Sequence, residues 1–146
     1  MLKEELSRVR FLGKEYPYKC DMVVLEKIQK EYGDIMKYEH GIRGVIPYVD
    51  ENGKRVRKRD VFTVPDVEMT CRSLAWMIGE GIDIEGKELE VPTEKEIMRQ
   101  EELNIAELAT LVFEEYSNCF LTKTRREEIR KMKDSQNSKK TEKKEK

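Results

Sequence analysis

The chain has one histidine, one tryptophan and three cysteines among its 146 residues, and it has no long apolar run. The cysteines, Cys20, Cys71 and Cys119, form no CxxC pair and stand among apolar neighbours, which predicts buried free thiols in a reducing compartment. No stretch approaches the roughly 18 to 20 apolar residues of a membrane helix, and the first residues are already charged. We therefore expect a cytoplasmic protein that makes no contact with a membrane.

The single histidine, His40, would have to take part in any zinc site or acid–base pair built on histidine. No cysteine or second histidine lies near it in the sequence, and metal ligands and catalytic groups come in sets. We expect a loop histidine, and a chain that is not an enzyme and has no catalytic residue, metal or cofactor.

Charge is abundant and unevenly distributed, since 40% of the residues are Asp, Glu, Lys or Arg. Residues 123–146 carry a net charge of +6, so that residues 1–122 carry −7. From Asp134 onward there is no apolar residue that could offset the entropy of ordering the chain. We predict a single acidic α+β domain over residues 1–122 and a charged helical extension, 123–146, that frays into a disordered basic tail.

Two hairpins are expected in the first half of the chain. Residues 8–12 and 16–20 flank Gly-Lys-Glu, and residues 45–49 and 56–64 flank a turn that contains Asn-Gly. Between them, Asp21 caps an amphipathic helix that ends at Gly33. These patterns predict small antiparallel hairpins with about four strands.

About four helices are expected to form a bundle against these hairpins. Besides the helix after Asp21, a buried stripe predicts a central helix that starts at Pro65 and Asp66 and breaks at Gly79 and Gly81. Capping boxes start two more helices, one of which ends near Leu103 and the other of which spans residues 105–120. The N-cap and N3 residues of these two boxes are Thr93 with Glu96 and Asn104 with Glu107.

Two groups of acidic residues could suggest a binding or catalytic site, but their spacing favours a purely structural role. The glycines and carboxylates of residues 79–86 have neither phosphate-loop nor calcium-loop spacing, which favours a helix end followed by a loop. The adjacent pairs Glu101–Glu102 and Glu114–Glu115 point about 100° apart on a helix, so we expect solvated surface carboxylates.

The second hairpin contains a cluster of cations that could contact nucleic-acid phosphates. Alternatively, the odd-numbered arginines face solvent on an edge strand and discourage aggregation. The acidic charge of residues 1–122 makes nucleic acid the less favoured partner. The cluster consists of Lys54, Arg55, Arg57, Lys58 and Arg59.

Four segments together resemble tail assembly chaperones of long-tailed phages and prophages. They are the hairpin FLGKEYPYK at residues 11–19, the helix at 22–33, the helix TCRSLAWMIGEG at 70–81 and the helix at 105–120. The resemblance covers about residues 8–122, and the basic hairpin 45–64 has no counterpart in it.

This resemblance implies a non-catalytic factor in the cytoplasm of a bacterial host, which binds the tape-measure protein, the tail-tube protein or both during tail assembly. Such a factor needs an exposed apolar surface for its partner. We expect that surface at Met69, Trp76, Met77, Tyr116 and Phe120, with ordinary core residues as the alternative. A prophage-encoded nucleic-acid-binding regulator that uses the basic hairpin is the second hypothesis.

Overall fold

The computed structural model describes residues 6–144, with side chains up to residue 136. This part of the chain is mixed α+β, with six α-helices and two separate two-stranded antiparallel sheets, β1–β2 and β3–β4. The α+β prediction is confirmed, whereas the expected number of helices was too low and the four strands do not form one arrangement. Residues 1–5 of the predicted domain (1–122) and residues 145–146 of the predicted extension (123–146) lie outside the described residues.

The first hairpin pairs β1 (Ser7–Phe11) with β2 (Lys14–Tyr18). Leu12 and Gly13 both have positive φ, as a two-residue turn that matches strand twist requires. The predicted hairpin is therefore confirmed, with a tighter turn than Gly-Lys-Glu. It packs on the central helix α3 (Val67–Glu85), and the backbone N–H of Lys19 donates to the Met77 carbonyl at 3.0 Å.

Helix α1 (Met22–Tyr32) begins where Asp21 accepts hydrogen bonds from two backbone N–H groups, as predicted. The sequence interpretation missed helix α2 (Ile35–Arg43), which Asp34 caps and which buries Tyr38 and Ile42. His40 therefore lies on a helix and not in a loop. The helical spacing of Ile35, Tyr38 and Ile42 was present in the sequence, but the glycines that follow His40 led to the prediction of a loop.

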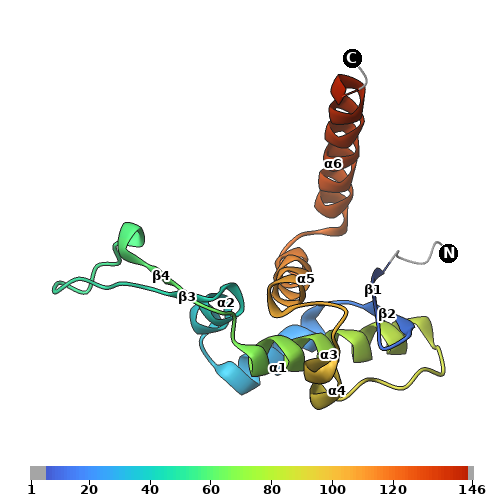
Figure 1. The fold of residues 1–146 in the computed structure, drawn as a ribbon, viewed down its shortest axis with the longest axis horizontal. Coiled ribbons are helices and arrows are strands. Elements are labelled where there is room, and N and C mark those ends of the chain that lie inside the picture. Colours follow the sequence, from blue (N-terminus) through green and yellow to red (C-terminus); the bar gives the residue numbers. More distant parts are fainter. Residues whose placement is uncertain (1–5, 145–146) are drawn as a thin grey trace.

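Helix α3 is central, as expected, and contacts the first hairpin and four other helices (Figure 1). It does not break at Gly79 or Gly81, because both glycines lie inside it and the left-handed stop comes at Gly86. Gly81 is buried against the backbone of Pro17. This glycine permits a close approach between helix and hairpin instead of ending the helix.

Two further helices complete the core. Helices α4 (Glu94–Arg99) and α5 (Ile105–Asn118) start at the two predicted capping boxes, and α4 ends before Leu103. The fully buried side chains of Ile97 and Val112 anchor these helices in the same hydrophobic cluster as Leu74 and Ile78 of α3. Burying each such side chain contributes roughly 1.5 to 3 kcal/mol.

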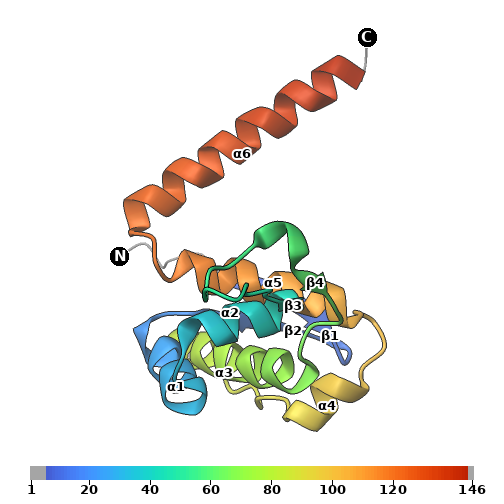
Figure 2. The same ribbon diagram turned by 90° about the vertical axis from the view of Figure 1, so that its left-hand side faces the viewer.

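Helix α6 (Lys123–Lys144) projects from the rest of the molecule (Figures 1 and 2). The helical extension was predicted, but the helix continues past Asp134, where fraying was expected. Its described side chains are exposed or half-buried, so it adds nothing to the hydrophobic core. None of the described helices is long and apolar enough to span a membrane.

Candidate functional site

Three of the five apolar residues predicted to form a partner surface are buried. Met69, Met77 and Tyr116 are at most 5% exposed and belong to the core. Trp76 is half-buried beside Tyr32 of α1, and Phe120, which is 58% exposed, packs edge-on against Tyr116. The expectation of exposure is wrong for the first three residues, for which the core alternative holds.

A different part of the chain exposes apolar side chains. Residues 45–64, which we call the arm, extend sideways from the end of α2 (Figure 1). Apart from Val45, no residue of the arm is buried. Six apolar side chains of the arm are between 38% and 79% exposed, namely Ile46, Tyr48, Val49, Val61, Phe62 and Val64.

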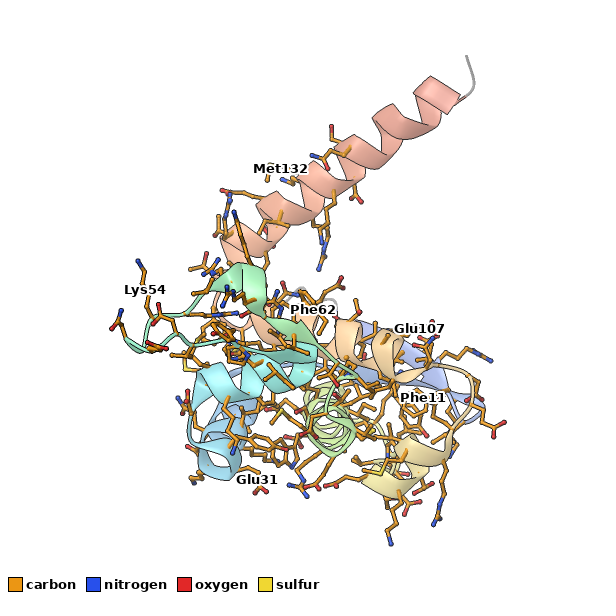
Figure 3. All side chains as sticks on the ribbon, turned by 60° about the vertical axis from the view of Figure 1, so that its left-hand side comes forward. Phe11, Glu31, Lys54, Phe62, Glu107 and Met132 are labelled. Atoms are coloured by element: carbon orange, nitrogen blue, oxygen red, sulfur yellow. The ribbon has the colours of Figure 1, made fainter. Side chains whose placement is uncertain are left out.

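Short backbone pairings hold the arm together. Strands β3 (Val45–Ile46) and β4 (Val61–Phe62) pair antiparallel, and Val49 makes an isolated bridge with Arg55. The predicted long strands 45–49 and 56–64 are therefore wrong, because a 3-10 turn, η1 (Arg57–Arg59), interrupts the second one. Figure 3 shows Lys54 near the tip of the arm and Phe62 nearer its base.

The cations of the arm divide into two groups. Arg55 donates to Asp60 at 2.7 Å, and this contact together with the Tyr48 backbone N–H lowers the pKa of Asp60. Arg59 lies over the Tyr48 ring, 5.4 Å from its centroid.

The other three cations of the arm, Lys54, Arg57 and Lys58, are exposed and form no ion pair within the described part of the chain. The predicted alternation of solvent-facing arginines on a strand is replaced by the turn η1.

The cysteines match the prediction of free thiols, although Cys119 is only half-buried. Burial raises the pKa of Cys71 to about 11 and that of Cys20 further. Both thiols therefore stay protonated at neutral pH, which is unfavourable for a nucleophile. In the part of the chain that the structure describes, no three His, Cys, Asp or Glu residues gather in a way that could hold a metal ion.

One predicted surface carboxylate is buried. Glu115 is 6% exposed, accepts from the Ser7 hydroxyl at 2.8 Å and accepts from the Cys20 backbone N–H at 3.2 Å. The expectation that both members of the pair Glu114–Glu115 are solvated is wrong for this residue. It connects α5 to the start of β1 and to the loop after β2, which is a structural role.

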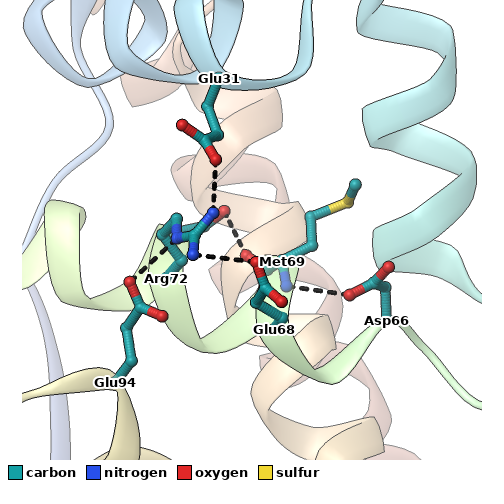
Figure 4. Close-up of polar contacts among 7 residues, drawn as sticks. Glu31, Asp66, Glu68, Met69, Arg72 and Glu94 are labelled. Carbon is teal, nitrogen blue, oxygen red and sulfur yellow. Dashed lines mark hydrogen bonds and ion pairs between the residues drawn. The ribbon is translucent and has the colours of Figure 1, made fainter.

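Arg72 of α3 holds three helices together (Figure 4). Its guanidinium contacts Glu31 of α1 at 2.6 Å, Glu94 of α4 at 2.9 Å and Glu68 of its own helix at 2.9 Å. These hydrogen-bonded pairs raise the pKa of Arg72, with Glu94 as the largest cause. The three glutamates occupy the Arg72 guanidinium, so this arginine is not available to bind a ligand.

Glu80 of α3 lies near Asp21, which caps the start of α1. Partial burial raises the pKa of Glu80 to about 7, and the neighbouring carboxylate of Asp21 contributes to this shift. Asp21 also accepts from the backbone N–H groups of Val23 and Val24, so Glu80 lies beside the cap of α1.

Glu80→Gln is expected to stabilise the protein at pH 8 by about 1 kcal/mol and to have no effect at pH 4. A raised pKa favours folding when the group is protonated in both states, and this advantage is lost as pH rises from the ordinary glutamate pKa to about 7. Urea unfolding at pH 4, 5.5 and 8 measures the difference, with the exposed Glu88→Gln as the control. An equal gain at pH 4 and pH 8 contradicts the assignment.

Comparisons of this chain with protein-family models, with curated proteins and with solved structures find no match.

Proposed function

We propose that this protein is a non-catalytic tail assembly chaperone of long-tailed phages or prophages. In this proposal it works in the bacterial host cytoplasm and binds the tape-measure protein, the tail-tube protein or both. The resemblance of residues 8–122 to that family supports the proposal, although the arm has no counterpart in that resemblance. The observation that carries it is the arm, which presents apolar side chains where a protein with no partner would bury or replace them.

The arm suits an apolar partner segment for two reasons. Phe62 is 79% exposed, and it shares the arm with Ile46, Val61 and Val64, each more than half exposed. Among the described residues the sheet that β3 and β4 form has only these two strands, so no third strand pairs with the outer edge of either. A partner segment that covers the arm removes apolar surface from water and extends the backbone pairing.

Co-expression of the full chain with the tape-measure and tail-tube proteins encoded beside its gene tests the proposal. We expect a pulldown to capture at least one of them and to keep it in solution at moderate and at high salt. Apolar burial is insensitive to ionic screening, so capture in high salt is the informative condition. If neither protein is captured at either salt concentration, the proposal is wrong.

The double variant Ile46→Ser, Phe62→Ser tests the arm itself. We expect it to reduce capture at least tenfold, since two exposed apolar anchors are lost and each 1.4 kcal/mol is a factor of ten. Met22→Ser with Val23→Ser is the matched control, because these residues are equally exposed on α1. If both double variants reduce capture equally, the arm is not the partner surface.

The unpaired cations of the arm favour a second candidate, a nucleic-acid-binding regulator. Lys54, Arg57 and Lys58 could each neutralise one phosphate, and three such contacts weaken binding roughly 40-fold between 50 and 200 mM salt. The same pulldown distinguishes the two functions. Nucleic acid that is retained at low salt and released at high salt, without a captured protein, supports the regulator.

A further inference from the structure

A cavity of about 360 Å³ lies between α2 and the arm. Met36, Val45 and Phe62 form its apolar part. Basic side chains reach it from both elements, His40 and Arg43 from α2 and Arg55 and Arg57 from the arm. The sequence alone did not connect these residues, because α2 was not predicted.

Two carboxylates also line this cavity, and both already have donors. Glu39 accepts from the Tyr116 hydroxyl at 2.8 Å. Asp60 accepts from the Arg55 guanidinium at 2.7 Å and from the Tyr48 backbone N–H at 3.1 Å. The three arginines outnumber the two carboxylates, so the cavity has a net positive charge without counting His40.

Not every donor of the cavity has an acceptor, although one nitrogen of Arg55 is paired with Asp60. Arg57 forms no ion pair within the described part of the chain, and Arg43 lies over the Phe113 ring, 5.6 Å from its centroid. Nε of Arg55 is buried and has no hydrogen-bond partner among the described residues. A buried donor without an acceptor is unfavourable, so a ligand that supplies an acceptor would relieve it.

We propose that this cavity binds an oxyanion through Arg43, Arg55 and Arg57. Planar guanidinium groups match the oxygen pairs of carboxylates and phosphates. The oxyanion can be an acidic side chain of a partner protein or a free phosphate, which offer the same oxygen acceptors. This site is tested separately from the chaperone proposal, because small-molecule probes replace the partner protein, although Phe62 lines the cavity and also belongs to the proposed partner surface.

The single histidine makes the test specific, because the imidazole C–H signals of His40 in an NMR spectrum report on this cavity alone. The full chain is titrated with sodium phosphate and, separately, with N-acetylglutamate N-methylamide, at fixed pH and at an ionic strength held constant with chloride. We expect a saturable shift with at least one probe. Tighter binding of phosphate identifies a free phosphate site, whereas tighter binding of the glutamate derivative identifies a site for an acidic side chain.

Arg57→Gln is expected to weaken the binding about tenfold, because a charge-assisted hydrogen bond is lost. Lys58→Gln is the matched control, as Lys58 is an exposed neighbouring cation that does not line the cavity. Both residues are exposed, so neither substitution endangers the fold. Shifts that stay linear with both probes, or equal weakening by both variants, would overturn the proposal.

Discussion

Gly81→Ala is expected to lower the free energy of unfolding by about 3 kcal/mol, the upper part of the range for overpacked sites. A Cβ atom at Gly81 would lie 2.6 Å from the carbonyl carbon and oxygen of Pro17 and 2.8 Å from the Tyr18 nitrogen. These are backbone atoms, which cannot rotate away as a side chain can. The hairpin would have to move off α3 and lose the hydrogen bond between Lys19 N–H and the Met77 carbonyl.

Gly79→Ala is the matched control, two residues earlier in the same helix. Its Cβ would make only an ordinary contact, 3.7 Å from a Val91 methyl group. Alanine also favours the helix over glycine by about 0.5 to 1 kcal/mol, so this variant should be slightly more stable than the parent protein. Urea unfolding followed by circular dichroism measures both. Opposite signs are expected, and a loss of stability in both variants would mean that helix flexibility, not close packing, requires the glycines.

Glu115→Ala is expected to destabilise the protein by about 3 kcal/mol. Its carboxylate accepts from the Ser7 hydroxyl and from the backbone N–H of Cys20, and Cys20 is 1% exposed. When a buried acceptor is removed, its donors lose their hydrogen bonds and cannot reach water instead, which is unfavourable. Thermal and urea unfolding measure the loss.

Glu114→Ala removes the exposed neighbouring carboxylate and should change stability by less than about 0.5 kcal/mol. Ser7→Ala, combined with Glu115→Ala in a double-mutant cycle, separates the Ser7 contact from the rest of the effect. Equal losses from Glu114→Ala and Glu115→Ala would show that α5 needs negative charge at this end and does not need a buried acceptor.

The parts of the fold that the sequence predicted depend on interactions between residues close in the chain. Asp21, Thr93 and Asn104 each cap a helix through contacts within three residues, and a tight hairpin before Asp21 follows from its turn. Such signals need no knowledge of the rest of the molecule.

The errors concern residues whose roles depend on distant parts of the chain. Gly81 was interpreted as a helix breaker because the backbone of Pro17 that it meets is 64 residues away in sequence. Glu115 was placed on the surface because its donors lie about a hundred residues earlier. The candidate partner residues Met69 and Met77 were assigned to an exposed face, but both belong to the hydrophobic core, where the Met69 side chain lies beside Gly41 of α2.

The arm has a consequence for how this protein could diversify. Apart from Val45, the arm contributes nothing to the buried interior, and its base consists of only two paired residues on each strand. Substitutions and changes in length between Ile46 and Val61 therefore escape the packing constraints that act on the helices. Chains that share this body can thus acquire different binding preferences by altering a single protruding segment, without any compensating change in the interior.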